Sequence, residues 1–244
     1  MARIRTLLLR AWIAAVTAVV LSGCDASTPV APSTMVGDLY IAANCLMVPG
    51  GVPPGVGAGI TAVIREGGDT GAAVPGLDVT LNGVALCFDQ SEQAYVGPPP
   101  PAQGGDEVAL RVADAGAALL RITGVPKPPW NLRLAENQWG TSSEDYVNQL
   151  TWNNPTWGCD AVLVLVYDYD PSSGTATLLY SRHLEADATF VSIRNDELAY
   201  YSTMTSATCL VCQTNTVAFP HNPDTSHFEV ATGVWGSWSC EAGR

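Results

Sequence analysis

Two cysteines three positions apart, Cys209 and Cys212, are the residues of this chain whose spacing most suggests chemistry. A Cys-x-x-Cys pair occurs in redox dithiols and as half of a zinc site. A redox dithiol of this kind belongs with a βαβ unit, whereas the flanking sequence here predicts strands without helices. A zinc ion would need a second pair of ligands, which Cys159 and Cys240 could supply. We favour a structural disulfide, and metal binding and redox catalysis stay open as alternatives.

Histidines and carboxylates gather in a second stretch, at His221, Asp224, His227 and Glu229. Imidazole and carboxylate groups can ligate a metal ion or transfer protons. The histidine spacing matches no zinc signature, however, and residues 222–225 have the composition of an ordinary turn. We therefore expect a solvated loop here, and we predict neither a metal site nor a cofactor.

The acidic stretch 168–174 invites comparison with a calcium loop. A helix–loop–helix calcium site needs glycine at its sixth position and a bidentate glutamate at its twelfth. Counted from Asp168, those positions hold Ser173 and Leu179, so we expect a polar hairpin turn instead. We expect His183 on the surface, near the end of a strand.

Nucleophilic catalysis finds little support in the sequence. It contains no Gly-x-Ser-x-Gly elbow that would expose a serine nucleophile. Catalytic triads are recognised by geometry, so a hydrolase built on a Ser–His or carboxylate pair is the least favoured alternative. We name no catalytic residue and predict that the protein is not an enzyme.

Tryptophans could bind a ligand if they are exposed. Six of the seven lie beyond residue 129, at Trp130, Trp139, Trp152, Trp157, Trp235 and Trp238. Trp152 should be part of a core. Trp139, Trp157 and Trp238 lie beside Gly or Asn in predicted loops, where an indole can stack on a sugar ring or anchor a protein partner. The alternative is that these three cap the ends of a small β-sandwich.

Short strands between turn signals must position these side chains. In the first half, residues 77–81 alternate apolar and polar side chains, as a strand with one buried face does. Asn82-Gly83 separates them from residues 84–88, and this dipeptide is the strongest short signal for a hairpin. Further strands are predicted at residues 60–64, 94–96, 108–112 and 118–122.

The second half shows the same organisation. Residues 147–152 alternate, with Leu150 and Trp152 on one face. Residues 161–169 form a near-continuous apolar run, which is typical of a strand buried on both faces. Further strands are predicted at residues 176–180, 190–193, 211–219 and 228–235. We expect no helix beyond the first 23 residues.

Both halves resemble known β-sandwich families. The run Val-Pro-Gly-Leu-Asp-Val-Thr-Leu-Asn-Gly at residues 74–83 resembles the immunoglobulin-like or transthyretin-like modules of bacterial envelope proteins. Further along, the Leu-Thr-Trp strand, a loop and a Val-x-Val-Tyr strand resemble the second and third strands of a fibronectin type III domain. Residues 208–213 have no counterpart in that pattern, which leaves the later strand order open.

These patterns predict an all-β fold with two tandem β-sandwiches. An immunoglobulin-like sandwich should occupy residues 37–125, and a fibronectin type III-like sandwich should occupy residues 130–244. Successive prolines make an extended, semi-rigid spacer, so we interpret residues 126–129 as the hinge between them.

The N-terminus indicates where the protein is located. Three arginines within the first ten residues, an apolar run over 11–21 and then small residues follow the order of a secretory signal peptide. The apolar run is far shorter than the roughly 20 residues of a spanning helix. Leu21-Ser22-Gly23-Cys24 resembles the lipobox of bacterial lipoproteins. That resemblance implies removal of residues 1–23 and diacylation of Cys24, followed by a flexible tether over 24–36.

Export to an oxidising compartment makes disulfides the first interpretation of the other cysteines. They are Cys45, Cys87, Cys159, Cys209, Cys212 and Cys240, which allow 15 pairings. We favour Cys45–Cys87, Cys159–Cys240 and Cys209–Cys212. The last pair needs a turn between its members, because residues three apart on a strand point to opposite faces.

Composition limits the partners. The chain has 244 residues, a formal net charge of −12 and a single lysine, Lys127. Such an acidic surface argues against nucleic acid and against an electrostatic hold on anionic lipid.

These features predict a lipid-anchored protein of the bacterial cell envelope, attached to a membrane through Cys24. We expect a non-catalytic binding or assembly role, with an envelope protein as partner. The alternative is a carbohydrate-binding lipoprotein, which requires two or more loop tryptophans to be exposed and coplanar. Inner and outer membrane both stay open as locations.

Asp25, directly after the lipobox cysteine, bears on the choice of membrane. In some enteric bacteria an aspartate at this position retains a lipoprotein in the inner membrane. If that rule operates here, Asp25→Ser should move the protein from the inner-membrane to the outer-membrane fraction of a separated envelope. Unchanged partitioning would reject a sorting role for Asp25.

Overall fold

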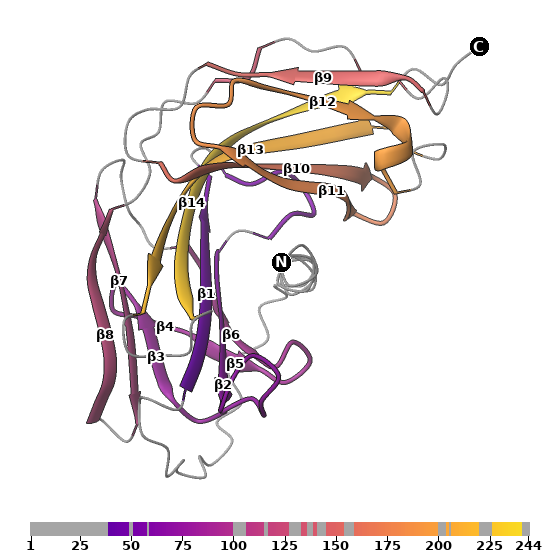
Figure 1. Cartoon of the computed structure of the whole chain (residues 1–244). Coiled ribbons are helices and arrows are strands. Elements are labelled where there is room, and N and C mark those ends of the chain that lie inside the picture. Colours follow the sequence, from indigo (N-terminus) through magenta and orange to yellow (C-terminus); the bar gives the residue numbers. More distant parts are fainter. Residues whose placement is uncertain are drawn as a thin grey trace.

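The protein is built almost entirely from β-strands, as Figure 1 shows. The computed structural model describes residues 39–48, 51–57, 59–99, 106–114, 117–126, 133–135, 139–140, 145–153, 159–199, 204, 206–219 and 226–240. The strands are β1 (Leu39–Met47), β2 (Gly59–Glu66), β3 (Asp78–Leu81), β4 (Val84–Ala85), β5 (Cys87–Asp89), β6 (Ala94–Gly97), β7 (Glu107–Asp114), β8 (Ala117–Pro126), β9 (Val147–Thr151), β10 (Ala161–Asp170), β11 (Thr175–Glu185), β12 (Phe190–Arg194), β13 (Ser206–Ala218) and β14 (His227–Ser239). A short 3₁₀ turn, η2 (Asn195–Glu197), follows β12. The predicted all-β fold class is confirmed.

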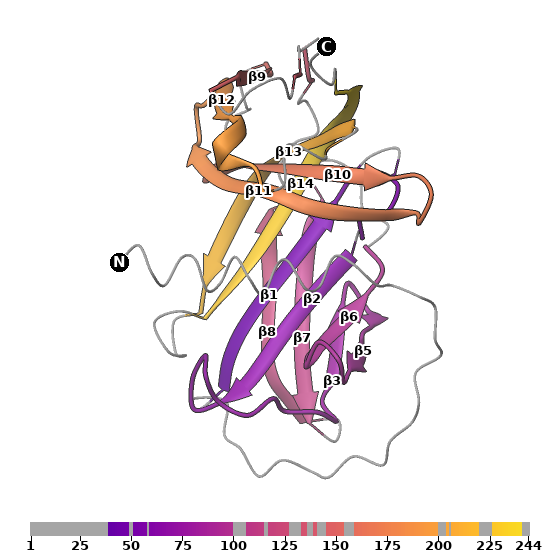
Figure 2. The ribbon, with the colours of Figure 1, turned by 90° about the vertical axis from the view of Figure 1, so that its right-hand side faces the viewer.

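Three sheets organise these strands. Eight strands form one large sheet in the order β11-β10-β13-β14-β1-β2-β6-β5, four form a second sheet in the order β4-β3-β7-β8, and β12 pairs with β9 in a two-stranded ribbon. In the large sheet β1 and β14 run parallel, and the other neighbours are antiparallel. The large sheet bends, so that β10 and β11 cross the direction of β1 and β2, and the long strands β13 and β14 extend from one group to the other (Figures 1 and 2).

The first core lies between the four-stranded sheet and one end of the large sheet. Alternate residues of β1, β2, β3 and β7 supply most of it, among them Ile41, Ile60, Leu81 and Leu110. The hairpin formed by β13 and β14 adds Phe219, Phe228 and Val230 to this same core. The C-terminal part of the chain therefore completes the core of the N-terminal part.

The second core lies beneath the β9–β12 ribbon. Leu150, Val191 and Ile193 of the ribbon pack there on inward-facing residues of β10 and β13, which are Val162, Val164, Val166, Ala207, Cys209 and Val211. Leu150 and Trp152 are buried, so the alternation predicted for residues 147–152 is confirmed.

A third apolar cluster lies on the opposite face of the large sheet, where the sheet bends. Leu163, Leu165 and Leu210 belong to it, and Val56 from the loop between β1 and β2 packs against it. Trp235 ties this loop down, because its indole Nε1 donates a hydrogen bond to the carbonyl oxygen of Gly51 at 3.1 Å. The loop thus covers part of a face that the other two sheets leave uncovered.

The Asn82-Gly83 turn forms as the sequence predicts. Asn82 has φ of 48° and Gly83 has φ of 81°, and both positive values belong to the tight turn that this dipeptide favours. The turn connects β3 to β4, which pair as antiparallel strands. This local hairpin prediction is confirmed.

Pairing across the large sheet corrects the predicted division into two consecutive sandwiches. Two sandwich-like layers exist, but β1 pairs with β14, and the β13–β14 hairpin contributes to both cores. The proline-rich segment 126–129 therefore does not separate two self-contained domains. Its first residue ends β8, and residues 127–129 lie outside the described residues.

A shared hairpin predicts that the two cores unfold together. Phe228, which is fully buried in the first core, should cost about 3–5 kcal/mol of unfolding free energy when replaced by alanine. Every tryptophan except Trp12 lies beyond residue 129, so tryptophan fluorescence during urea unfolding reports mainly on the other part of the molecule. A single transition displaced to lower urea by Phe228→Ala is the expected result.

Phe190→Ala is the matched control, since this ring is 62% exposed. It should change the unfolding free energy by no more than about 0.5 kcal/mol. If Phe228→Ala left the tryptophan fluorescence transition at the same urea concentration, the proposal that the two cores share a hairpin and unfold together would be contradicted.

Candidate functional site

The outward-facing side of the β9–β12 ribbon is the most exposed apolar surface among the described residues. Side chains alternate along β12, so that Val191 and Ile193 enter the second core and Phe190 points to solvent. Phe190 is 62% exposed and Val147 is 44% exposed. We call this surface the ribbon face, and it consists of Val147, Gln149, Thr151, Phe190, Ser192 and Arg194.

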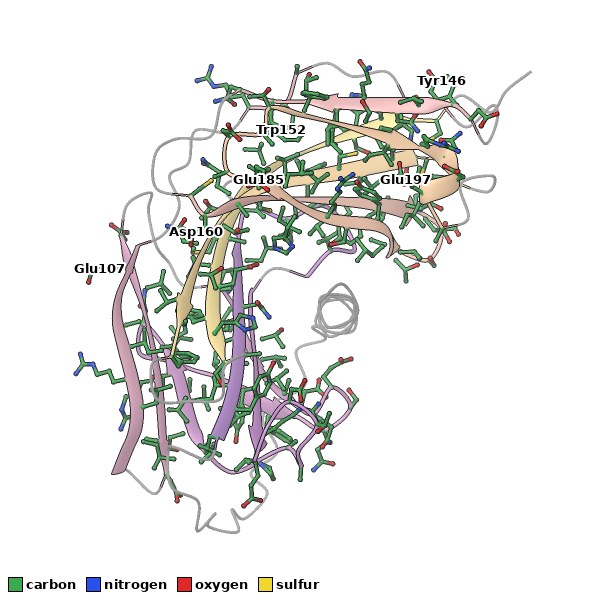
Figure 3. The ribbon with its side chains drawn as sticks, viewed as in Figure 1. Glu107, Tyr146, Trp152, Asp160, Glu185 and Glu197 are labelled. Atoms are coloured by element: carbon green, nitrogen blue, oxygen red, sulfur yellow. The ribbon has the colours of Figure 1, made fainter. Side chains whose placement is uncertain are left out.

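Strand register arranges the ribbon face as three cross-strand pairs. They are Phe190 with Thr151, Ser192 with Gln149, and Arg194 with Val147. The aromatic ring therefore lies at one end, the guanidinium lies at the other, and two hydrogen-bonding side chains lie between them. Figure 3 labels the residues that flank β9, with Trp152 at the phenylalanine end and Tyr146 at the arginine end.

A buried polar network fixes the ribbon in place. Asn148, which is fully buried, accepts a hydrogen bond from the Gly140 backbone N–H at 2.9 Å and donates one to the Asn195 side-chain oxygen at 2.7 Å. At the other end, the Trp152 indole Nε1 donates to the carbonyl oxygen of Ala188 at 2.7 Å. A buried polar group without a hydrogen-bond partner destabilises the folded state. This network therefore opposes any shift in the strand register of the ribbon. The ribbon face is accordingly preorganised.

Arg194, the one cation of the ribbon face, is neutralised by neighbouring carboxylates. The Arg194 guanidinium is hydrogen-bonded and ion-paired to Asp196, and Asp145 lies 3.8 Å away. The hydrogen bond that Arg194 donates to Asp196, together with the negative charge of that carboxylate, raises the pKa of Arg194 above its usual range. The backbone N–H of Arg194 also donates to the Glu197 carboxylate at 2.8 Å. The face is thus an aromatic and hydrogen-bonding surface, not a basic patch.

A contact between a histidine and a glutamate links two strands that are not neighbours in the large sheet. His183 Nε2 of β11 lies 3.4 Å from Glu229 Oε2 of β14, and β10 and β13 lie between these strands in the sheet. The Glu229 side chain is 12% exposed and the His183 side chain is 39% exposed. The other carboxylate oxygen of Glu229 is buried without a hydrogen-bond partner among the described residues. The pair braces the bend of the sheet.

This arrangement corrects the prediction for the histidine and carboxylate cluster. Glu229 and His227 do not lie in a solvated loop, because both belong to β14. At both positions this strand pairs with β1 on one side and with β13 on the other. His221 and Asp224 lie outside the described residues. In the part of the chain that the structure describes, no three His, Cys, Asp or Glu side chains are placed to hold a metal ion.

Asp170 confirms the hairpin turn predicted between residues 168 and 174. Its carboxylate accepts hydrogen bonds from the Ser172 backbone N–H at 2.8 Å and from the Ser173 hydroxyl at 2.8 Å. The hydrogen bonds from Ser172, and then from Ser173, lower the pKa of Asp170 to about 2. A lowered pKa means that the ionised form supports the turn above about pH 4, and that this support is lost as the pH falls toward 2.

The Cys209–Cys212 disulfide is not formed, and the alternation of a strand explains why. Both residues lie within the uninterrupted strand β13, with no turn between them. Cys209 packs in the second core, and Cys212 packs in the third cluster on the opposite face. Burial raises the pKa of both thiols, and the neighbouring Cys240 and Glu229 add to the shifts. Neither thiol is activated as a nucleophile.

The Cys159–Cys240 pairing is also wrong. Cys159 precedes β10 at the end where Ala161 pairs with Thr214, whereas Cys240 follows the end of β14, where Ser239 pairs with Ser206. The eight positions of β13 between those pairs span about 26 Å, and a disulfide needs Cα atoms within about 7 Å.

The Cys45–Cys87 pairing fails for a similar reason. Cys45 lies in β1 and Cys87 lies in β5, and β2 and β6 separate these strands in the sheet. Three strand spacings amount to about 14 Å, which is twice the reach of a disulfide. Cys24, the predicted lipidation site, lies outside the described residues.

Tryptophans predicted at loop surfaces mostly pack against the second core. Trp139 is 5% exposed within that core, and Trp238 lies in β14, half-buried against it. Trp157 lies outside the described residues. The structure therefore agrees with the packing alternative for Trp139 and Trp238. Trp152 lies in the core, as predicted.

The exposure of Phe190 was not among the predictions, although the sequence contains a pattern that indicates it. The run Phe-Val-Ser-Ile-Arg alternates, and burial of Val191 and Ile193 requires that Phe190 face the same way as Ser192 and Arg194. An aromatic residue in phase with serine and arginine is the pattern that marks this surface.

Comparison with known proteins does not assign a family. No protein-family model matches the sequence, and no curated protein matches it. Matches among solved structures include the FN1–FN3 domains of chicken CNTN1, at 10% identity over 78% of this chain and 68% of that one, with a TM-score of 0.27. They also include a DUF3823 family protein from Bacteroides ovatus, at 8% identity over 80% of this chain and 98% of that one, with a TM-score of 0.24. The Yersinia pseudotuberculosis adhesin InvE matches at 11% identity over 81% of this chain and 60% of that one, with a TM-score of 0.22. Scores this low carry no argument about this chain.

A double-mutant cycle measures the strength of the contact between His183 and Glu229. His183→Ala leaves the Glu229 carboxylate buried without its partner and should lower the unfolding free energy by about 1 kcal/mol, a modest value because the His183 side chain is 39% exposed. Combined with Glu229→Gln, it should show a coupling energy of about 0.5–1 kcal/mol in urea unfolding. Arg194→Ala, at an ion pair whose arginine is 53% exposed, should leave the urea unfolding transition essentially unchanged. Additive effects of His183→Ala and Glu229→Gln would show that the pair does not brace the bend.

Proposed function

We propose that this chain is a lipid-anchored protein of the bacterial cell envelope that binds an envelope protein through the ribbon face, without catalysis. The observation that carries the binding proposal is the 62% exposure of Phe190 on a regular and internally braced ribbon. Aromatic side chains are enriched at the centres of protein interfaces, where a few of them supply most of the binding free energy. Gln149 and Ser192 beside the ring offer the hydrogen bonds of an interface rim.

Charge supports a protein partner over a polyanion. The chain has a formal net charge of −12, and the one arginine of the ribbon face is paired with Asp196. Nucleic acids and anionic lipid surfaces are bound through clustered, unpaired cations, and the ribbon face offers none. Burial of Phe190 against an apolar pocket of another protein suits the face better.

A role without catalysis fits the use of the candidate reactive groups. The Asp170 carboxylate is engaged by the serines of its own turn, and Glu229 is paired with His183. The Cys209 and Cys212 thiols are buried, and their pKa values are raised, whereas a nucleophilic cysteine needs a lowered pKa.

The anchoring part of the proposal rests on the sequence alone. Leu21-Ser22-Gly23-Cys24 has the lipobox pattern, and two acyl chains on one cysteine supply the paired signals of stable membrane attachment. Residues 24–36 would span at most about 45 Å between the lipid and the body if fully extended. Within the described residues, no helix has the length and apolar character needed to cross a bilayer.

Removal of the Phe190 ring tests the binding proposal. Residues 25–244 serve as bait for cross-linking in envelope extract, and the affinity of the captured protein is then measured with purified components. Phe190→Ala should weaken that affinity by about thirty-fold, the loss typical of an interface hot spot of about 2 kcal/mol. Its unfolding free energy should remain that of the unaltered chain, because the ring is exposed.

A matched pair of arginine substitutions provides the control. Ser192→Arg places a bulky charge in the middle of the ribbon face, and Thr216→Arg places the same group at an exposed position of β13 beside Glu229. The first should abolish capture and the second should preserve it. A partner that both variants still bind would reject the ribbon face as the interface. Sugar binding on a parallel glycan array, if lost in Phe190→Ala, would replace the protein partner by a glycan.

A further inference from the structure

The C-terminal end of β14 is a strand edge that no other described strand covers. β1 pairs with β14 only as far as Thr232, and beyond that point the described neighbour of β14 is β13 alone. The pairing with β13 continues without a bulge to Ser239. Successive residues of a strand direct their backbone N–H and C=O groups to opposite sides, so residues 235–239 present some of these groups on the uncovered side. We call residues 235–239 the β14 edge.

The β14 edge has none of the features that usually keep a strand edge from pairing with another chain. Natural edges are protected by lysine or other charged side chains, by proline or by bulges. The sequence of this edge is Trp-Gly-Ser-Trp-Ser, which contains neither a charge nor a proline. Trp235, Ser237 and Ser239 are exposed, so a second chain can reach the strand.

The two tryptophans of the edge lie on opposite faces of the sheet. Trp235 pairs with Leu210 of the third cluster and is 38% exposed, and its hydrogen bond to Gly51 restrains the indole. Trp238 pairs with Ala207 of the second core and is half-buried. The remaining residues of the edge are glycine or serine. Each face of the edge therefore carries one large side chain together with small residues.

We propose that two copies of this chain pair through their β14 edges as antiparallel strands, around a two-fold axis at Ser237. Residues opposite each other in such a pair lie on the same face, and their side chains are in contact. With the axis at Ser237, Trp235 lies opposite the partner's Ser239, and Trp238 lies opposite the partner's Gly236. Each indole thus meets a small residue, and an aromatic ring opposite a glycine packs where the glycine has no side chain. The same patch serves both copies, as in any two-fold interface.

The lack of charge on the edge favours a second copy as its occupant. Two bodies that each carry a formal net charge of −12 repel one another, and like charges directly opposite in a sheet are destabilising. An uncharged edge lets the copies meet where neither has to desolvate a charge. Salt screens the remaining repulsion between the bodies, so the dimer should strengthen as the ionic strength rises. A partner held by opposite charge would bind more weakly under the same change.

Such a dimer contains one continuous sheet that runs through both copies. A two-fold axis perpendicular to the sheet keeps each face on the same side in both copies, so both β9–β12 ribbons lie on one side of the joined sheet. The inference does not depend on binding at the ribbon face, because the pairing uses the β14 edge alone.

Sedimentation equilibrium of residues 25–244, which include every described residue, tests the proposal. Reductant in the buffer excludes links through the native cysteines. We expect monomers and dimers with no larger species, because a two-fold pair leaves neither β14 edge free. The dissociation constant of the dimer should fall as salt is added. A monomer across the whole concentration range, or open-ended association, would overturn the proposal.

A matched pair of lysine substitutions locates the interface. Ser237→Lys places two lysines opposite each other at the two-fold axis and should weaken the dimer by at least about tenfold. Ser192→Lys makes the same change at an exposed serine of β12 and should leave the dimer as it is. Urea unfolding of both variants should match that of the unaltered chain, because both serines are exposed. A dimer that resists Ser237→Lys, or one that Ser192→Lys abolishes, would place the contact elsewhere.

Ser237→Cys tests the register in the full chain, in the membranes of the bacteria that produce it. Residues opposite each other in an antiparallel pair have Cα atoms about 4.5–5.5 Å apart, which lies within the reach of a disulfide. Mild oxidation should therefore give a covalent dimer, in which peptide mapping finds position 237 of one chain linked to position 237 of the other. Ser192→Cys is the control and should give no such dimer. Links from position 237 to native cysteines alone, or no link at all, would reject this register.

Discussion

The parallel pairing of β1 with β14 is the interaction on which the rest of the structure depends. It brings Ala42 beside His227 and continues to Met47 beside Thr232, in the middle of the eight-stranded sheet. The Ile41 backbone N–H also donates to the Ser226 hydroxyl at 3.1 Å, just before β14 begins. Because β1 and β14 pair, β2, β6 and β5 extend the sheet on one side of them, and β13, β10 and β11 extend it on the other. Without it, each half would expose a long unpaired strand edge.

The pairing of β1 with β14 also explains how one sheet contributes to two cores and still leaves a surface available for binding. The four-stranded sheet covers one end of the large sheet, and the two-stranded ribbon covers the other. The ribbon is a single layer with only five residues in each strand, so each strand that buries Val191 or Leu150 must turn its alternate residues to solvent. Exposure of Phe190 is thus tied to the burial of its neighbours. The buried Asn148 and Asn195 amides brace the arginine end of the ribbon, and the Trp152–Ala188 hydrogen bond braces the end that carries Phe190.

Local patterns in the sequence predicted local structure well. The Asn82-Gly83 hairpin, the alternation at Leu150 and Trp152, the buried run that became β10 and the Asp170 turn all depend on neighbours within a few residues, and all are present. The all-β class follows from the same short-range signals. Residue types alone could therefore position most strands along the chain.

What the sequence did not predict depends on partners far away in the chain. β1 is buried on both faces and shows no alternation of apolar and polar residues, so no strand was expected there. Glu229 was predicted to be a loop residue, and the side chain it contacts, His183, lies in a strand that is not its neighbour. The three disulfide pairs failed because order along the chain does not reveal strand order in the sheet or the face on which a cysteine lies. The ribbon face could have been found from alternation, but its exposure also requires that no other described strand cover it, which alternation alone does not predict.

Closure of the large sheet by its first and last described strands has a consequence for the way the protein is made. Ile41 and Ser226, which meet at this closure, are 185 residues apart in the chain. A polypeptide leaves the ribosome, or passes through a membrane channel, with its N-terminus first. The apolar segment that becomes β1 therefore emerges long before β14, the strand with which it pairs. Contacts between such distant residues slow folding, and an apolar strand without its neighbour is prone to aggregate. The newly made chain should therefore depend on a chaperone that shields this segment until the C-terminal hairpin arrives.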